Sequence, residues 1–240
     1  MITNPGIKAI IIATIFIIAS ITSLVIINSY WEMIGFGGLW IYSGIMIAIG
    51  IIWILLMGKR GIEKNPLKTT DFALIAMFAA LLMIVDTGSM FVPGLSALWY
   101  IAPIIAGPIL SYFPMGIVLA AGLKLSPKPG AAFTLFIVYQ IIGQILFFNP
   151  IWLARSILLA LAIEAFYISS KRGTTVALAL MGLMFGILLN SSAGIFQIYN
   201  WGFWQPLFIM LPEAILSGIM MVVGVFLGSA IAERSKSVMF

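Results

Sequence analysis

The sequence has no cysteine and no histidine among its 240 residues. Without these side chains, disulfide bonds, thiolate nucleophiles, His-ligated haem and ordinary zinc sites are excluded. Histidine is also the usual general base near neutral pH, and it is missing. We therefore expect a protein that is not an enzyme and that binds neither a metal nor a cofactor.

Charged residues are scarce as well. They make up 8% of the chain, against about 25% in a soluble domain, whereas 63% of the residues are apolar. This composition predicts an all-α, multi-pass protein of the cell membrane. The net charge of +5 comes from basic residues between apolar stretches, so it does not indicate nucleic-acid binding.

Eight apolar stretches are candidates for membrane spans, each of which needs about 20 residues. They are Ile7–Ile27, Leu39–Met57, Leu67–Val85, Leu95–Leu123, Ala131–Phe148, Ile151–Ile168, Thr174–Ile198 and Pro206–Ala232. We expect residues 1–62 to form a two-helix N-terminal extension and residues 63–240 to form a six-helix membrane core.

Eleven of the twelve lysines and arginines lie in every second gap between these stretches. Because basic residues stay on the cytoplasmic side during insertion, both termini are predicted to be cytoplasmic. The stretch Leu95–Leu123 holds three prolines and could be one kinked span or two short ones. Two spans would invert every later helix and leave six basic residues on each side, so the pattern favours one. Arg155 is then the one basic residue on the outer side.

Four ionisable residues fall within the spans or at their outer ends, where such groups are costly and usually face a cavity or a partner. They are Asp86, Arg155, Glu164 and Glu213. Arg155 and Glu164 share a helix but point to opposite faces, so they cannot pair. We expect Arg155 to meet Asp86, Glu213 or a ligand anion, unless it snorkels to the outer headgroups. Glu164 is either a ligand-binding group or a structural hydrogen-bond partner between helices.

Amide side chains are also placed within the spans. Gln140 and Gln144 lie four residues apart on one helix face beside Tyr139, and Asn190 lies in the seventh stretch. Such amides can hold helices together. They can also hydrogen-bond a neutral heterocycle.

Tryptophans gather near the predicted outer ends, among them Trp152 and Trp204. They are either an aromatic belt at the headgroups or a stacking wall for a flat ligand. Together with the amides, Glu164, Glu213 and Arg155, they could form one pocket that opens to the outside.

Small residues form a flat face in the third stretch, where Ala76 and Ala80 lie one helical turn apart. Such a face allows close helix packing, either inside the protein or against another membrane subunit. The following segment, Asp86–Ser96, is predicted to be an outer loop, and its Gly88 and Gly94 could serve as the hinges of a lid.

This arrangement resembles the substrate-binding S component of energy-coupling factor (ECF) transporters, especially the branch for the thiamin precursor hydroxymethylpyrimidine. Six spans with both ends inside match that family's core. The sharper resemblance lies in Pro127-Lys-Pro-Gly-Ala-Ala132, Asn149-Pro-Ile-Trp152 and Ile163-Glu-Ala-Phe166. Ala154-Arg-Ser-Ile-Leu158 stands where that branch has glycines and a glutamine, and the first two spans are an addition.

The resemblance implies a capture subunit that binds thiamin or hydroxymethylpyrimidine outside and works with a transmembrane coupling protein and two ATPases. The chain has no Walker sequence of its own. Within this hypothesis, Trp152 and Trp204 stack on the ligand, and Gln140, Gln144 and Asn190 hydrogen-bond its ring. Glu164 accepts from an amine or a ring N–H. In the same family comparison, Ala76 and Ala80 resemble the face that meets the coupling protein.

Two other functions are compatible with the sequence. An ion-coupled secondary transporter or channel would use Glu164 and Glu213 as proton or cation sites. A non-catalytic assembly subunit of a membrane complex would use its polar groups only for packing. Flux driven by an ion gradient without partner subunits would distinguish the first of these from a capture subunit.

Overall fold

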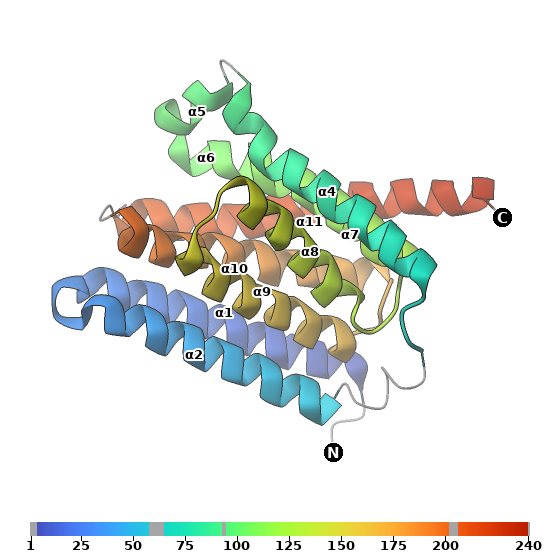
Figure 1. Ribbon diagram of the computed structural model, residues 1–240, viewed down its shortest axis with the longest axis horizontal. Helices are drawn as coiled ribbons and strands as arrows, with labels where there is room; N and C mark the ends of the chain where they lie inside the picture. Colours follow the sequence, from blue (N-terminus) through green and yellow to red (C-terminus); the bar gives the residue numbers. More distant parts are fainter. Residues whose placement is uncertain (1–3, 58–64, 93–94, 202–205, 240) are drawn as a thin grey trace.

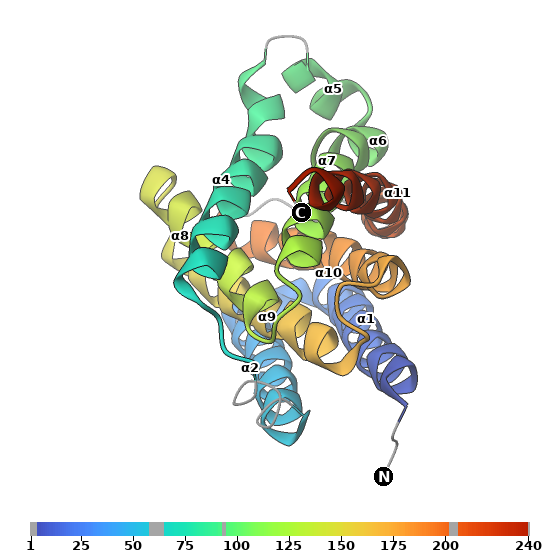
Figure 2. The same cartoon turned by 90° about the vertical axis from the view of Figure 1, so that its right-hand side faces the viewer.

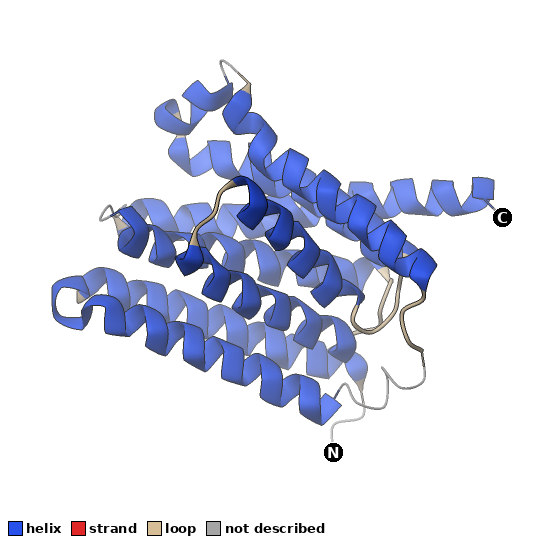
Figure 3. Cartoon of the chain, in the orientation of Figure 1, coloured by secondary structure: helices blue, strands red, loops and turns tan. Residues whose placement is uncertain are grey.

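The computed structural model describes residues 4–57, 65–92, 95–201 and 206–239. These residues form helices and short connections, and none of them is in a β-strand (Figure 3). The elements are α1 (Pro5–Ser29), α2 (Trp31–Met57), α4 (Thr69–Phe91), α5 (Leu95–Ile101), α6 (Pro103–Gly107), the π-helical turn η1 (Pro108–Tyr112), α7 (Phe113–Leu125), α8 (Ala131–Leu146), α9 (Pro150–Ser169), α10 (Thr175–Trp201) and α11 (Leu207–Met239).

Seven segments of these helices are long and apolar enough to cross a membrane, so the chain has the character of a multi-pass membrane protein. The predicted fifth span is the exception. It forms α8, whose 16 residues rise only about 24 Å, less than the roughly 30 Å of a bilayer core. Gly130, with a left-handed φ of 85°, precedes α8, and Pro150 starts the next helix, so neither end can extend.

The proline-rich stretch forms one helix of spanning length, Ile104–Leu125, as the basic residues predicted. Its first part differs from a single kinked span, because α5 is a separate short helix before a break at Ala102 (φ −137°, ψ 62°). Pro103 lies in the first turn of α6, where its missing N–H leaves no hydrogen bond unmade. Pro108 and Pro114 lie inside the continuous helix, because the residues before them keep helical dihedral angles, and the π-helical turn η1 begins at Pro108.

The predicted lid loop Asp86–Ser96 is wrong for its first six residues, because α4 continues to Phe91. Thr87 favours the helix by donating its hydroxyl to the Met83 carbonyl at 2.8 Å. The expected hinge Gly94 lies outside the described residues. Asp86 is therefore a helical residue whose carboxylate faces other helices.

All helix ends that carry basic residues lie at one end of the bundle, on the right in Figure 1. We call it the basic end. Its described basic residues are Lys8, Lys68, Lys124, Lys128, Lys171, Arg172 and Arg234. The first described helix begins at this end and the last one finishes there. The alternation seen in the sequence thus corresponds to a real separation in space.

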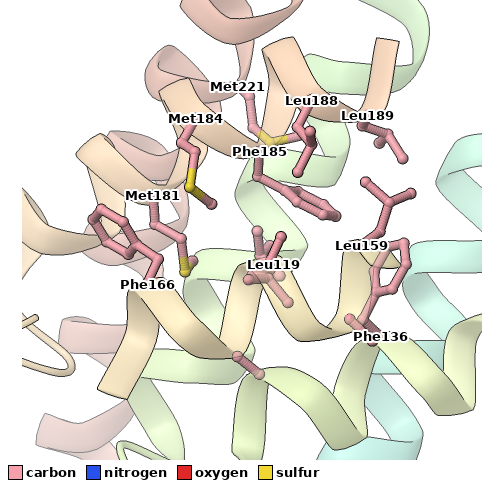
Figure 4. Close-up of a cluster of buried hydrophobic side chains, with 14 of the residues drawn as sticks. Leu119, Phe136, Leu159, Phe166, Met181, Met184, Phe185, Leu188, Leu189 and Met221 are labelled. Carbon is pink, nitrogen blue, oxygen red and sulfur yellow. The ribbon is translucent and has the colours of Figure 1, made fainter. Parts of the chain in front are cut away.

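Helices α9 and α10 lie in the middle of the bundle, with α1 and α2 on one side and the other long helices around them (Figure 2). Their facing sides form an apolar core that includes Leu159, Phe166, Phe185 and Leu188, all fully buried (Figure 4). Phe185 also meets Phe136 of α8 edge to face, with ring centroids 5.0 Å apart. Polar residues on these facing sides, such as Arg155 and Ser192, are therefore buried.

Helices α7 and α11 approach each other closely through glycine. A Cβ atom on Gly224 would lie 2.1 Å from the Phe113 carbonyl oxygen, and one on Gly228 would lie 2.1 Å from that of Ile117. We expect Gly224→Ala to force the helices apart and to cost about 1–3 kcal/mol of stability, measured by thermal unfolding in detergent. Gly44→Ala is the matched control, since that Cβ meets nothing within 4 Å. Equal unfolding temperatures for the two variants would contradict this packing.

Candidate functional site

Arg155 is the centre of the candidate site. It lies on α9, about 8 Å along the helix from the end opposite the basic residues, and is only 7% exposed. Its Nε donates to Ser192 Oγ at 3.0 Å and its Nη2 to the Leu189 carbonyl at 2.6 Å. Its guanidinium also lies over the Trp152 ring, 4.6 Å from the centroid. The alternative of snorkelling is therefore not observed, because the guanidinium is held inside the bundle against α10.

Two carboxylates share this region, as the sequence predicted. Asp86 of α4 accepts a hydrogen bond from the Tyr139 hydroxyl of α8 and interacts electrostatically with Arg155. Within the described part of the chain, however, no carboxylate oxygen lies within 4.0 Å of the Arg155 nitrogens. The guanidinium and Asp86 are thus near each other without forming a direct ion pair.

Tyr112 connects the second carboxylate to the first. It interacts electrostatically with Arg155, Asp86 and Glu213, and it also interacts with the Asn190 side chain. Asn190 in turn interacts with Glu213. We call these residues the polar cluster: Asp86, Tyr112, Tyr139, Arg155, Asn190 and Glu213. They come from six elements, α4, η1, α8, α9, α10 and α11.

The polar cluster is an unusual feature for a bundle in lipid. Ionisable side chains inside a membrane are expensive and most often mark a ligand or ion pathway. Each member lies within about 16 Å of the helix end opposite the basic residues. With Arg155 and both carboxylates ionised, the formal charge is +1 − 2 = −1. Such a site suits a ligand that carries a positive charge together with hydrogen-bonding groups.

Five residues named in the sequence analysis are members of the polar cluster: Asp86, Tyr139, Arg155, Asn190 and Glu213. Gln140 lies beside them, because its Oε1 accepts from Ser156 Oγ at 2.7 Å on α9. Trp152 joins through the Arg155 contact. These residues therefore lie in one region of the bundle.

Two other predicted residues, Gln144 and Glu164, have different surroundings. Gln144 accepts from the Asn149 backbone N–H at 3.0 Å and so supports the connection between α8 and α9. Trp204 lies outside the described residues. Glu164 lies on α9 towards the basic end, about 14 Å along the axis from Arg155.

The Glu164 carboxylate caps α8. Its Oε1 accepts from the Gly130 N–H at 2.7 Å and its Oε2 from the Phe133 N–H at 3.0 Å. These N–H groups at the helix start have no partner within the helix, and a carboxylate there is favourable. The expectation that Glu164 shares one pocket with Arg155 is therefore corrected, since its two oxygens hold the helix start instead.

Tyr112 is the member of the polar cluster that the sequence did not predict. It lies in the proline-rich stretch, where the only signal was a hydroxyl-bearing aromatic within an apolar run. The π-helical turn Pro108–Tyr112 sets its direction, and such turns are not predictable from periodicity.

The basic end holds two ion pairs of a different kind. Lys124 of α7 meets Glu233 of α11 at 2.5 Å and also donates to Thr175 at 2.9 Å. Lys128 meets Asp71 of α4 at 2.6 Å. Each charge has a partner, so we interpret these pairs as ties between helices. Among the described residues, no three acidic side chains are grouped so as to hold a metal ion.

Comparison with known proteins adds no relative, since no family model, no curated protein and no solved structure matches this chain. The site is therefore interpreted from its own geometry.

Proposed function

We propose that this protein is the substrate-binding subunit of an ECF-type importer and that thiamin or its pyrimidine precursor occupies the polar cluster. The observation that carries the proposal is the buried Arg155 with the half-buried carboxylates of Asp86 and Glu213 in the same cluster, near the end opposite the basic residues. If the basic end is cytoplasmic, as the charge rule predicts, this cluster lies on the side from which a nutrient arrives.

The charge of the cluster favours thiamin. Its thiazolium ring carries one positive charge, which complements the formal charge of −1, and its aminopyrimidine ring has donors and acceptors. Asn190 and Gln140 provide matching amide groups, and Trp152 provides an aromatic face. Hydroxymethylpyrimidine is neutral and would lack the charge term.

The segments that carry the family resemblance meet in the structure, which supports the proposal. Gly130 belongs to the Lys-Pro-Gly-Ala-Ala turn, and Glu164 belongs to the third segment, Ile163-Glu-Ala-Phe166, 34 residues after Gly130. Glu164 binds the backbone of this turn and so joins the two. If this part of the chain has the same local structure as the family that it resembles, the residues on both sides of the contact are expected to follow that family's sequence pattern.

An S component also needs a face for its coupling protein. Ala76 is exposed and Ala80 is half-buried, and Met77 beside them is 51% exposed. This side of α4 therefore has no partner among the described residues. We propose that it contacts the coupling protein, which works with two ATPases, in the cell membrane.

Titration of the purified full-length protein in lipid nanodiscs tests the proposal. We expect saturable quenching of tryptophan emission by thiamin and a weaker response to hydroxymethylpyrimidine, because only thiamin carries the charge. Riboflavin, which is uncharged and larger, is the control ligand. Absence of binding by both pyrimidine compounds would contradict the proposal.

Two membrane carboxylates, Asp86 and Glu213, favour one alternative: an ion-coupled transporter. That function requires flux by the isolated protein in liposomes under a proton or sodium gradient. An S component without its coupling protein and ATPases shows none. Gradient-driven uptake would therefore replace the importer proposal by this one.

A further inference from the structure

We propose that the N-terminal hairpin of α1 and α2 is one wall of the polar cluster, and that Tyr42 of α2 is a positioning residue for the Arg155 guanidinium. The positioning of Arg155 stands on the contacts below. Its consequence for thiamin affinity rests on the function proposed above. Helices α1 and α2 would then be part of the binding unit and not an appendage to a complete core.

A series of hydroxyl groups, from Tyr42, Ser20 and Ser191, links the hairpin to α10, and we call it the relay. The Tyr42 hydroxyl lies 3.2 Å from Ser20 Oγ of α1, and Ser20 Oγ lies 2.5 Å from Ser191 Oγ of α10. Ser191 in turn donates to the Ile187 carbonyl at 2.8 Å. All three hydroxyl-bearing residues are at most 3% exposed. Such a buried chain has a defined direction, because each hydroxyl has one hydrogen to donate.

The direction follows from the two ends of the chain. The carbonyl of Ile187 can only accept, so Ser191 donates to it and accepts from Ser20. Ser20 then accepts from Tyr42. Tyr42 therefore gives its hydroxyl hydrogen to Ser20 Oγ.

Arg155 is connected to this relay through α10. Ser192, which accepts from Arg155 Nε at 3.0 Å, directly follows Ser191, so the relay also fixes the turn of α10 that holds the guanidinium. Tyr42 and Arg155 are both buried and interact electrostatically. Tyr42 thus acts on Arg155 through Ser20 and the turn of α10 that contains Ser191 and Ser192.

The hairpin is held firmly enough for this role. Towards one end, Tyr199 of α10 donates to the Gly35 carbonyl at 2.5 Å and packs edge to face on Trp31, with centroids 4.8 Å apart. Gly35 has a φ of 52°, so the break in α2 at this point requires glycine. Towards the basic end, Trp53 Nε1 donates to Ser169 Oγ of α9 at 2.6 Å. The relay lies between these two fixed points.

Tyr42→Phe in the full-length protein tests the proposal through Trp152, which contacts Arg155 directly. For the wild-type protein and for each variant, a second protein that also carries Trp152→Phe is prepared. The difference between the two emission spectra is the emission of Trp152. We expect Tyr42→Phe to change this difference spectrum, because the guanidinium is no longer held in place over the ring. Thiamin affinity is expected to fall about three- to tenfold, the effect of one hydrogen bond.

Ser43→Ala is the control. Ser43 is the next residue of α2, is 2% exposed, and its Oγ has no hydrogen-bond partner among the described residues. It should leave both the Trp152 spectrum and the affinity as in the wild-type protein. A Trp152 spectrum unchanged by Tyr42→Phe, or changed equally by Ser43→Ala, would overturn the proposal. If thiamin does not bind the wild-type protein, the proposed function fails, but the spectrum still decides the position of Arg155.

Discussion

We expect the replacement of Arg155 by methionine to abolish the proposed thiamin binding and to lower the unfolding temperature by about 10 °C. Methionine keeps much of the apolar stem but removes the positive charge with which Asp86 interacts. It also leaves the Ser192 hydroxyl and the Leu189 carbonyl without their donor, and each such loss costs about 1–3 kcal/mol, so we expect a total cost of about 3 kcal/mol. For a chain of this size, each kcal/mol shifts the midpoint by about 2–4 °C. Thermal unfolding in nanodiscs measures the loss.

Two companion variants show whether charge or shape is responsible. Arg155→Lys keeps the charge but loses the planar fork that reaches both Ser192 and Leu189, so it should recover part of the stability. Adding Asp86→Asn to Arg155→Met removes one uncompensated charge and should also raise the midpoint. An Arg155→Met protein that unfolds and binds thiamin like the wild type would exclude a functional role for the cluster.

The helices themselves were predictable because long apolar stretches have few alternatives in a membrane. Seven of the eight predicted spans form helices of spanning length. The basic residues correctly indicated which connections lie at the same end of the bundle. The remaining one, the fifth stretch, forms α8, which is shorter because Gly130 and the Asn149-Pro150 pair limit it. Local signals of this kind were visible in the sequence, but their effect on the length of a span was not.

The polar cluster was only partly predictable. A buried Arg155 could be inferred from its cost in lipid, and so could its proximity to Asp86. Tyr112 could not, because its direction depends on a π-helical turn. The role of the first two helices was also hidden, since Ser20 and Ser191 are 171 residues apart and their contact depends on tertiary packing.

Substitutions of Glu164 distinguish a structural role from a ligand-binding role more clearly than those of any other residue named above. Glu164→Met leaves the Gly130 and Phe133 N–H groups without their acceptor, and each such loss costs about 1–3 kcal/mol. We therefore expect a total loss of about 2–4 kcal/mol and an unfolding temperature lower by roughly 8 °C. Thiamin affinity, measured well below that temperature, should stay within about twofold of the wild type, because Glu164 lies about 14 Å along α9 from Arg155.

Glu164→Gln is the graded control for this prediction. The glutamine keeps one carbonyl oxygen as acceptor, so it should lose about half as much stability as the methionine variant. If Glu164 is a helix cap, the unfolding temperature should fall from the wild type to Glu164→Gln and further to Glu164→Met, with no effect on thiamin affinity. A ligand-binding role predicts the reverse, with thiamin binding lost in both variants while the unfolding temperature stays near that of the wild type. In that case Glu164 would be part of the pocket, and the position of the thiamin site would have to move from Arg155 towards the basic end.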